Sequence, residues 1–87
     1  SGIRMASTPE MIEVETGLYE HYKGMRYRVL GVSRHSETLE PLVVYETLYE
    51  NPLGRLWVRP AARFKETVTI DGIVKPRFKK LTEASST

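Results

Sequence analysis

Residues 25–49, MRYRVLGVSRHSETLEPLVVYETLY, carry two runs of alternating apolar and polar side chains joined by a polar turn. A period of two is typical of strands with one buried face. Within residues 25–34 the apolar side chains keep to one face up to Val29 and to the other from Leu30 onward. Such a slip indicates a β-bulge or sharp coil, and Gly31 stands beside it. Because strongly bent strands are typical of small closed barrels, these residues favour a barrel over a flat sheet.

Local signals on either side extend this pattern of short strands. Further strands are expected over residues 17–24, 55–59, 64–70 and 73–78, with a single helical turn over residues 60–63. Asp71-Gly72 between two isoleucines predicts a type I′ hairpin turn, and Pro76 marks an edge strand because it lacks a backbone donor. Together these signals predict an all-β fold, a small SH3-like antiparallel barrel of about five strands with one short helical turn.

Length, composition and charge indicate one small soluble domain. The 87 residues include no cysteine, which excludes disulfides and thiolate zinc sites. The net charge of +2 is spread along the chain, so it does not predict a strong nucleic-acid stripe. No apolar run is long enough to span a membrane. We expect a cytoplasmic protein with residues 1–10 as a tag or disordered leader, residues 11–81 as the single domain and residues 82–87 as a frayed tail.

Aromatic side chains give the best indication of a binding surface. The chain has five tyrosines and one tryptophan, and a barrel of this size buries about three or four such side chains, so the others are expected at the surface. Exposed aromatics flanked by arginines form grooves for extended peptides or unstacked bases. The alternative is that all six pack in the core or at its rim. The candidate binding residues are Arg34, His35, Ser36, Glu37, Thr38, Tyr45, Tyr49, Trp57 and Arg59.

The turn His35-Ser36-Glu37-Thr38 gathers the groups of an acid–base site. Consecutive side chains diverge in a turn, however, and the same residues are typical of turns closed by bonds from side chains to the backbone. We therefore predict that this turn is structural or forms one polar end of a groove, and catalysis by His35 and Glu37 is the alternative. His21 and His35 lack the spacing of a metal site, so no metal or cofactor is predicted.

Glu46 is a carboxylate in the middle of the strand expected at residues 42–49. It either faces solvent through the pleat or is buried and paired with an arginine such as Arg59. The second arrangement would link this strand to the one that carries Trp57.

Several short motifs resemble a known bacterial family. The matching pieces are Gly17-x-Tyr19-x-His21-Tyr22-Lys23-Gly24, Tyr27-x-Val29, His35-Ser36-Glu37-Thr38, Trp57-Val58-Arg59-Pro60 and Asp71-Gly72 followed by Arg77-Phe78. Over residues 17–81 they resemble the uncharacterised family that is domain of unknown function number sixteen fifty-three. The resemblance implies a short, single-domain, SH3-like protein, and it brings no biochemical activity with it.

The function that we expect from the sequence is that of a non-enzymatic binding module. Tyr45, Tyr49 and Trp57 would supply stacking or apolar contact, and Arg34, His35 and Glu37 would supply polar specificity. The expected partner is an extended peptide of another protein, with single-stranded nucleic acid as the second candidate and no membrane contact. One alternative is a small enzyme or ligand-responsive domain, and another is a structural protein whose exposed aromatics are covered in a homodimer.

Overall fold

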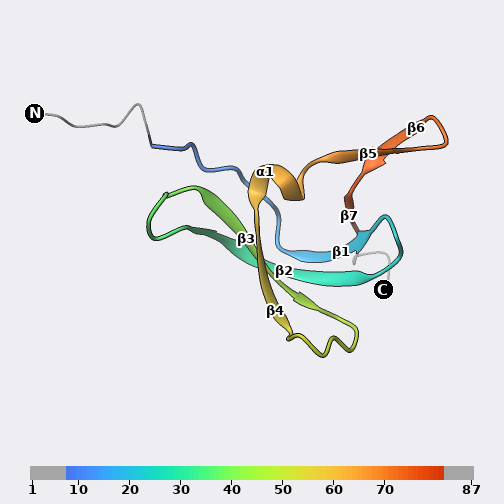
Figure 1. Cartoon of the computed structure of the whole chain (residues 1–87), viewed down its shortest axis with the longest axis horizontal. Coiled ribbons are helices and arrows are strands. Elements are labelled where there is room, and N and C mark those ends of the chain that lie inside the picture. The colour runs from blue at the N-terminus through green and yellow to red at the C-terminus, as the bar shows by residue number, and fades with distance from the viewer. Residues whose placement is uncertain (1–7, 82–87) are drawn as a thin grey trace, which may run out of the picture.

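The computed structural model describes residues 8–81, which form a five-stranded sheet, a two-stranded sheet and one helical turn (Figure 1). The elements, in chain order, are β1 (Gly17–His21), β2 (Arg26–Arg34), β3 (Pro41–Thr47), β4 (Leu56–Pro60), α1 (Ala61–Phe64), β5 (Thr67–Ile70), β6 (Ile73–Pro76) and β7 (Phe78–Lys80). The predicted leader, residues 1–10, is described from residue 8 onward, and the predicted tail, residues 82–87, lies outside the described residues.

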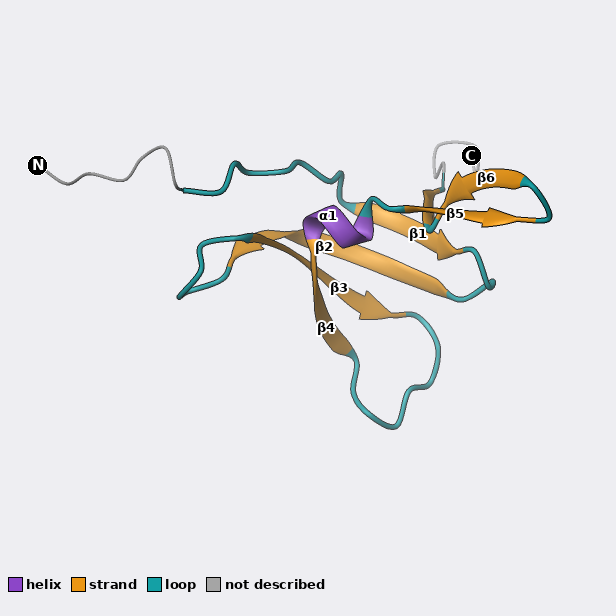
Figure 2. Ribbon diagram, turned by 45° about the horizontal axis from the view of Figure 1, so that its top comes forward, coloured by secondary structure: helices purple, strands orange, loops and turns teal. Residues whose placement is uncertain are grey.

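The five-stranded sheet has the order β4-β3-β2-β1-β7, and every neighbouring pair is antiparallel. β5 and β6 pair with each other in a hairpin that projects from the rest of the molecule (Figure 2). The predicted β-rich class with one short helical turn is confirmed. Closure into a barrel is not seen, since no pairing joins β4 to β7 within residues 8–81. β7 has three residues and pairs with β1 alone among the strands of residues 8–81, so the β4 edge has no partner in β7.

The irregularity predicted in β2 is confirmed. β2 pairs with β3 in one register up to Val29↔Tyr45 and in another from Gly31↔Val44 onward. Leu30 is the extra residue at this shift, and its side chain is 46% exposed. A bulge of this kind bends its strand and increases the local twist. The slip in the hydrophobic pattern therefore marked a real bend in the sheet.

Two turns have backbone angles that favour glycine. Asp71 and Gly72 have φ of 52° and 79°, both positive as a type I′ turn requires, so the predicted hairpin turn between β5 and β6 is confirmed. Gly24, in the turn between β1 and β2, has φ of 106°. Residues with a Cβ rarely adopt such an angle, so this tight turn depends on glycine.

The helical turn extends one residue beyond the predicted range. α1 begins directly after Pro60, whose φ of −52° suits the start of a helix. Phe64 was predicted to begin a strand, but it ends α1, and β5 begins at Thr67. The helical position lets the Phe64 ring stack on Phe78, with 4.3 Å between ring centroids and 4° between their planes. No helix in residues 8–81 is long and apolar enough to cross a membrane.

The core lies on the face of the sheet that α1 covers, and it is mostly aromatic. Tyr19 packs edge-on against Phe64 with 5.2 Å between centroids, and Tyr27 packs edge-on against Tyr45 at 5.3 Å. The buried core residues are Tyr19, Tyr27, Val29, Val43, Tyr45, Ala61, Phe64 and Phe78. Three of the five tyrosines are thus buried, which leaves Tyr22, Tyr49 and the half-buried Trp57 nearer to solvent.

Candidate functional site

The structure divides the predicted site residues between the two ends of β3. Tyr45, Tyr49, Trp57 and Arg59 line one hollow near its C-terminal end. Residues 34–38 lie at the end of β2 and in the turn that precedes β3. A strand of seven residues separates its two ends by roughly 20 Å. The two groups are therefore separate surfaces and do not share one groove.

In the turn before β3, the imidazole of His35 holds the backbone in place. Its Nδ1 accepts hydrogen bonds from the backbone N–H groups of Glu37 (3.0 Å) and Thr38 (3.2 Å). Because Nδ1 is an acceptor, a neutral ring carries its proton on Nε2. Thr38 Oγ1 in turn donates to Glu40 Oε1 (3.2 Å) and accepts from the Glu40 N–H (3.3 Å). Ser36 lies exposed in the same turn.

Arg34 ties this turn to the segment that precedes β1. Its Nη1 donates to the carbonyl oxygens of Leu39 (2.6 Å) and Pro9 (3.0 Å). Leu39 has φ of 67°, an unfavourable angle for a leucine. The guanidinium stabilises this strained residue, so Arg34 has a structural role in the turn.

At the other end of β3, two hollows lie side by side. The first has a volume of about 200 Å³, and its lining residues are Tyr27, Tyr45, Thr47, Tyr49, Asn51, Trp57 and Arg59. The second, of about 410 Å³, is lined by Thr47, Leu48, Tyr49, Glu50, Asn51, Gly54 and Arg55. The two linings share Thr47, Tyr49 and Asn51, so the hollows are adjacent. We call this surface the β3–β4 groove.

Tyrosine rings form the floor of the β3–β4 groove. The hydroxyls of Tyr27 and Tyr49 are hydrogen-bonded at 3.0 Å. Burial, followed by this hydrogen bond, raises the pKa of Tyr27 far above its usual range, so its hydroxyl stays neutral. Tyr45 is 7% exposed and packs against Tyr27, so the stacking surface predicted for it is used by the core. Tyr49 comes after the last residue of β3 and is 37% exposed.

Trp57 and Asn51 shape the loop side of the groove. The indole Nε1 of Trp57 donates to the carbonyl oxygen of Gly54 at 3.0 Å, which fixes the ring against the loop. Asn51 Oδ1 accepts from the N–H of Leu53 at 2.9 Å, as in an Asx-turn. The side-chain NH₂ group of Asn51 then remains as a donor on the groove surface.

Arg59 is the cationic residue of the first hollow. Its guanidinium carbon lies 5.4 Å from the centroid of the Phe78 ring, a cation–π distance. Its Nε is buried, and no described residue provides it with a hydrogen-bond partner. No carboxylate within residues 8–81 forms an ion pair with it. The groove thus contains a positive charge that the described chain does not neutralise.

The suggested pair between Glu46 and Arg59 is wrong. Glu46 pairs with Arg55 and, at 3.9 Å, with Arg28. The register explains the difference, because Arg59 is opposite the buried Val43 while Glu46 is opposite Leu56. Successive side chains alternate between the faces of a sheet, so Arg59 and Glu46 point to opposite faces.

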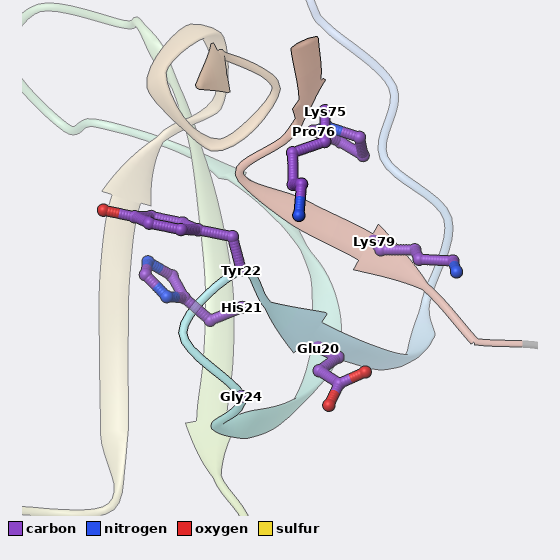
Figure 3. A pocket seen from close by; sticks show the side chains of 7 residues that line it. All are labelled: Glu20, His21, Tyr22, Gly24, Lys75, Pro76 and Lys79. Carbon is purple, nitrogen blue, oxygen red and sulfur yellow. The ribbon is translucent and has the colours of Figure 1, made fainter. Parts of the chain in front are cut away.

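A third hollow, which the sequence did not predict, lies beside the turn that follows β1 (Figure 3). Its volume is about 430 Å³, and its lining residues are Glu20, His21, Tyr22, Gly24, Lys75, Pro76 and Lys79. The motif His21-Tyr22-Lys23-Gly24 was visible in the sequence. Its lysine partners are distant in the chain: Lys79 is brought to it by the pairing of β1 with β7, and Lys75 is on β6. No cluster of His, Cys, Asp or Glu in residues 8–81 has the geometry of a metal site.

Comparison with known proteins identifies a family and a related crystal structure that this chain resembles. A family model described as "Protein of unknown function (DUF1653)" matches residues 17–80, a range that includes the lining of all three hollows. A crystal structure of a protein from Bordetella bronchiseptica that belongs to DUF1653 is 36% identical in sequence, with a TM-score of 0.76. The match covers 83% of this chain and 92% of that one. The comparison with curated proteins gives no match.

Proposed function

The chain belongs to the DUF1653 family, and we propose that it is a non-enzymatic binding module whose β3–β4 groove holds an extended peptide that carries a carboxylate. The observation that carries this proposal is the unpaired Arg59 beside Tyr49 and Trp57. A planar guanidinium in a partly buried site matches a carboxylate through paired hydrogen bonds. Either an acidic side chain or a free C-terminus would supply that group.

The remaining lining of the groove suits a peptide backbone. Tyr49 offers a hydroxyl and Asn51 an amide NH₂, and both can bond the main chain of an extended segment. Trp57 and Tyr49 offer apolar ring surface for its side chains. Grooves with this mixture of aromatic surface and polar groups are typical of sites that bind extended peptides.

The charge of the groove favours a peptide over nucleic acid. Arg55 is already paired with Glu46, and Glu50 adds a negative charge to the lining. Arg59 is then the one unneutralised cation in the lining that the structure describes. Binding to a nucleic-acid backbone usually depends on several lysines or arginines that contact successive phosphates.

The hydrogen bonds of His35 favour a structural role over an acid–base role. Its Nδ1 is already bonded to two backbone N–H groups of its own turn. A general base needs a nitrogen directed at a substrate proton within hydrogen-bond reach. The strand order, with α1 before the last strands, supports an SH3-like arrangement into which the β5–β6 hairpin is inserted.

The test is a titration of Trp57 fluorescence with short extended peptides that end in either a free or an amidated carboxyl group. Peptides with a carboxylate should bind, and Arg59→Gln should weaken that binding by about tenfold or more, since hydrogen bonds between charged groups are the stronger class. Arg63→Gln is the matched control, because Arg63 is exposed on α1 and outside the groove. Equal affinity for both kinds of peptide, or equal losses in both variants, would contradict the proposal.

A homodimer joined along β4 is a second candidate, and one observation favours it. Leu56 and Val58 are each 57% exposed on this strand, which pairs with β3 and with no other strand in residues 8–81. An apolar edge strand is prone to pair with another copy. Analytical ultracentrifugation would detect the dimer, and Val58→Lys should dissociate it. A monomeric wild-type protein at high concentration would exclude this candidate.

A further inference from the structure

The hollow beside the turn after β1 contains a pair of aromatic rings held in a fixed position. The rings of His21 and Tyr22 lie 4.5 Å apart between centroids, at an angle of 34° (Figure 3). His21 also packs edge-on against the buried Phe78 at 4.9 Å. Its Nδ1 accepts a hydrogen bond from the N–H of Lys23 at 3.1 Å, so the imidazole is held from two sides. The two rings form a prepared surface for another flat ring.

Cations line the hollow, and two of them lie over the Tyr22 ring. Lys75 and Lys79 line the hollow, and both are exposed. Lys23 Nζ lies 5.8 Å from the centroid of the Tyr22 ring, and Arg77 lies 5.9 Å from the same centroid. No carboxylate in residues 8–81 forms an ion pair with any of the three lysines.

The negative charges near the hollow are already paired. Glu20, which lines the hollow, lies 4.0 Å from the Nε of Arg26. Glu66 lies 3.6 Å from Arg77, whose Nε is buried without a hydrogen-bond partner among the described residues. Burial and then the charges of Arg77, Arg59 and Lys23 lower the pKa of His21. This shift is consistent with a positive potential in the hollow.

We propose that this hollow binds a phosphorylated aromatic base, the chemical unit of a nucleotide, with the base against the His21–Tyr22 ring pair and the phosphate against Lys75 and Lys79. The site is distinct from the β3–β4 groove and does not depend on its proposed function. A volume of about 430 Å³ is within the usual range for small-molecule sites. Base stacking on aromatic side chains together with cations that contact phosphate is the usual means of binding single strands.

Other anions fit the hollow less well. An acidic peptide would satisfy Lys75 and Lys79 but would bring no base to the His21–Tyr22 ring pair. Inorganic phosphate would do the same. A nucleotide uses both features, whether it is free in solution or part of a single-stranded nucleic acid.

The experiment measures binding of a fluorescein-labelled oligothymidylate by anisotropy, and binding of adenosine and uridine monophosphates by NMR. Lys79→Gln is compared with Lys80→Gln, which removes the same charge from the next residue, outside the hollow. Lys79→Gln should weaken binding by about fivefold or more, and the double variant Lys75→Gln/Lys79→Gln should lower the slope of log affinity against log salt by roughly two. The loss of affinity caused by Lys80→Gln should be less than about half the loss caused by Lys79→Gln.

Tyr22→Leu tests the stacking, and Tyr22→Phe keeps the ring if the leucine variant fails to fold. Tyr22→Leu should lose about fivefold or more in affinity, while Tyr22→Phe should retain it. Tighter binding with longer oligonucleotides would identify a nucleic-acid strand as the ligand, and equal binding of monophosphates would identify free nucleotides. No binding of either probe at millimolar concentration, equal losses in the Lys79 and Lys80 variants, or an unaffected Tyr22→Leu would overturn the proposal.

Discussion

Single side chains in this protein have roles that depend on where their strand ends. Tyr45 and Tyr49 have the same parity in the sequence, so an alternating pattern assigns them to one face. β3 ends at Thr47, however, and the chain beyond it leaves the sheet. Tyr45 is therefore in the core, while Tyr49 is at the surface of the groove. The sequence could predict that some tyrosines are exposed, but not which ones, because strand ends are set by contacts between distant residues.

His21 should make the stability of the fold depend on pH. Burial and the nearby charges of Arg77, Arg59 and Lys23 lower its pKa in the folded chain. As pH falls below about 6.5, the unfolded chain takes up a proton at His21 that the folded chain does not yet accept. The contribution of His21 to stability is thus complete above that pH and is lost progressively as pH falls toward the folded pKa.

Urea unfolding of the wild type and His21→Gln at pH 7.5 and 5.5 checks this expectation. The free energy of unfolding should fall more for the wild type than for His21→Gln as the pH is lowered. NMR titration of the His21 ring should give a midpoint below 6.5. Identical pH dependence in the two proteins would exclude this role for His21.

Phe64 should be among the residues that contribute most to stability. Its ring is 2% exposed and stacks on Phe78, and it contacts Tyr19 edge-on. Phe64→Ala should lower the free energy of unfolding by about 3–5 kcal/mol, because it removes apolar contacts and leaves a cavity. Leu53→Ala is the control, since Leu53 is 81% exposed, and it should change stability by less than about 0.5 kcal/mol. Similar losses in the two variants, measured by chemical denaturation, would contradict this view of the core.

Among the elements, those with a local cause were predicted best. The type I′ turn at Asp71-Gly72 and the bulge at Leu30 both follow from a few adjacent residues. The end of α1 was misplaced because Phe64 gains more from stacking on Phe78, a contact distant in sequence, than from a strand position. Barrel closure was also predicted from local bending, but it requires a partner for β4 that β7 does not supply.

The two glycines of the β1–β2 region should respond differently to substitution. Gly24 has φ of 106°, so Gly24→Ala should lower the free energy of unfolding by about 1–2 kcal/mol or more through backbone strain. At Gly31 φ is not in the positive region, and an added Cβ would meet nothing within 4 Å. Gly31→Ala should therefore leave stability unchanged or raise it by up to about 1 kcal/mol. Thermal unfolding of both variants gives the comparison, and a larger loss at Gly31 would contradict this assignment of the bulge.

In the molecule as a whole, the pairing of β1 with β7 creates the hollow that no local pattern predicts. It brings Lys79 opposite Glu20 and Phe78 opposite His21. The nearby Arg59 packs on the same Phe78, lines the β3–β4 groove and lowers the pKa of His21. The two proposed sites thus lie on either side of one arginine and one phenylalanine. A ligand bound in either site should change the electrostatic potential at the other site, because both sites are close to the charge of Arg59.

The β5–β6 hairpin can be removed to separate these two sites. None of its residues belongs to the core found in residues 8–81, and the backbone N–H of Arg77 donates to the carbonyl oxygen of Glu66 at 2.9 Å across its base. Replacement of residues 67–76 by an Asn-Gly turn should therefore leave a folded protein with cooperative thermal unfolding.

The shortened protein lacks Lys75 and Pro76, so it should bind oligothymidylate more weakly than the wild type, while its peptide groove remains intact. Lys75→Gln in the full hairpin is the matched control, and it should account for most of the lost affinity if charge is the cause. Loss of cooperative unfolding on removal of the hairpin would instead mean that β5 and β6 stabilise the core, and equal weakening of peptide and oligonucleotide binding would mean that the two surfaces are one site.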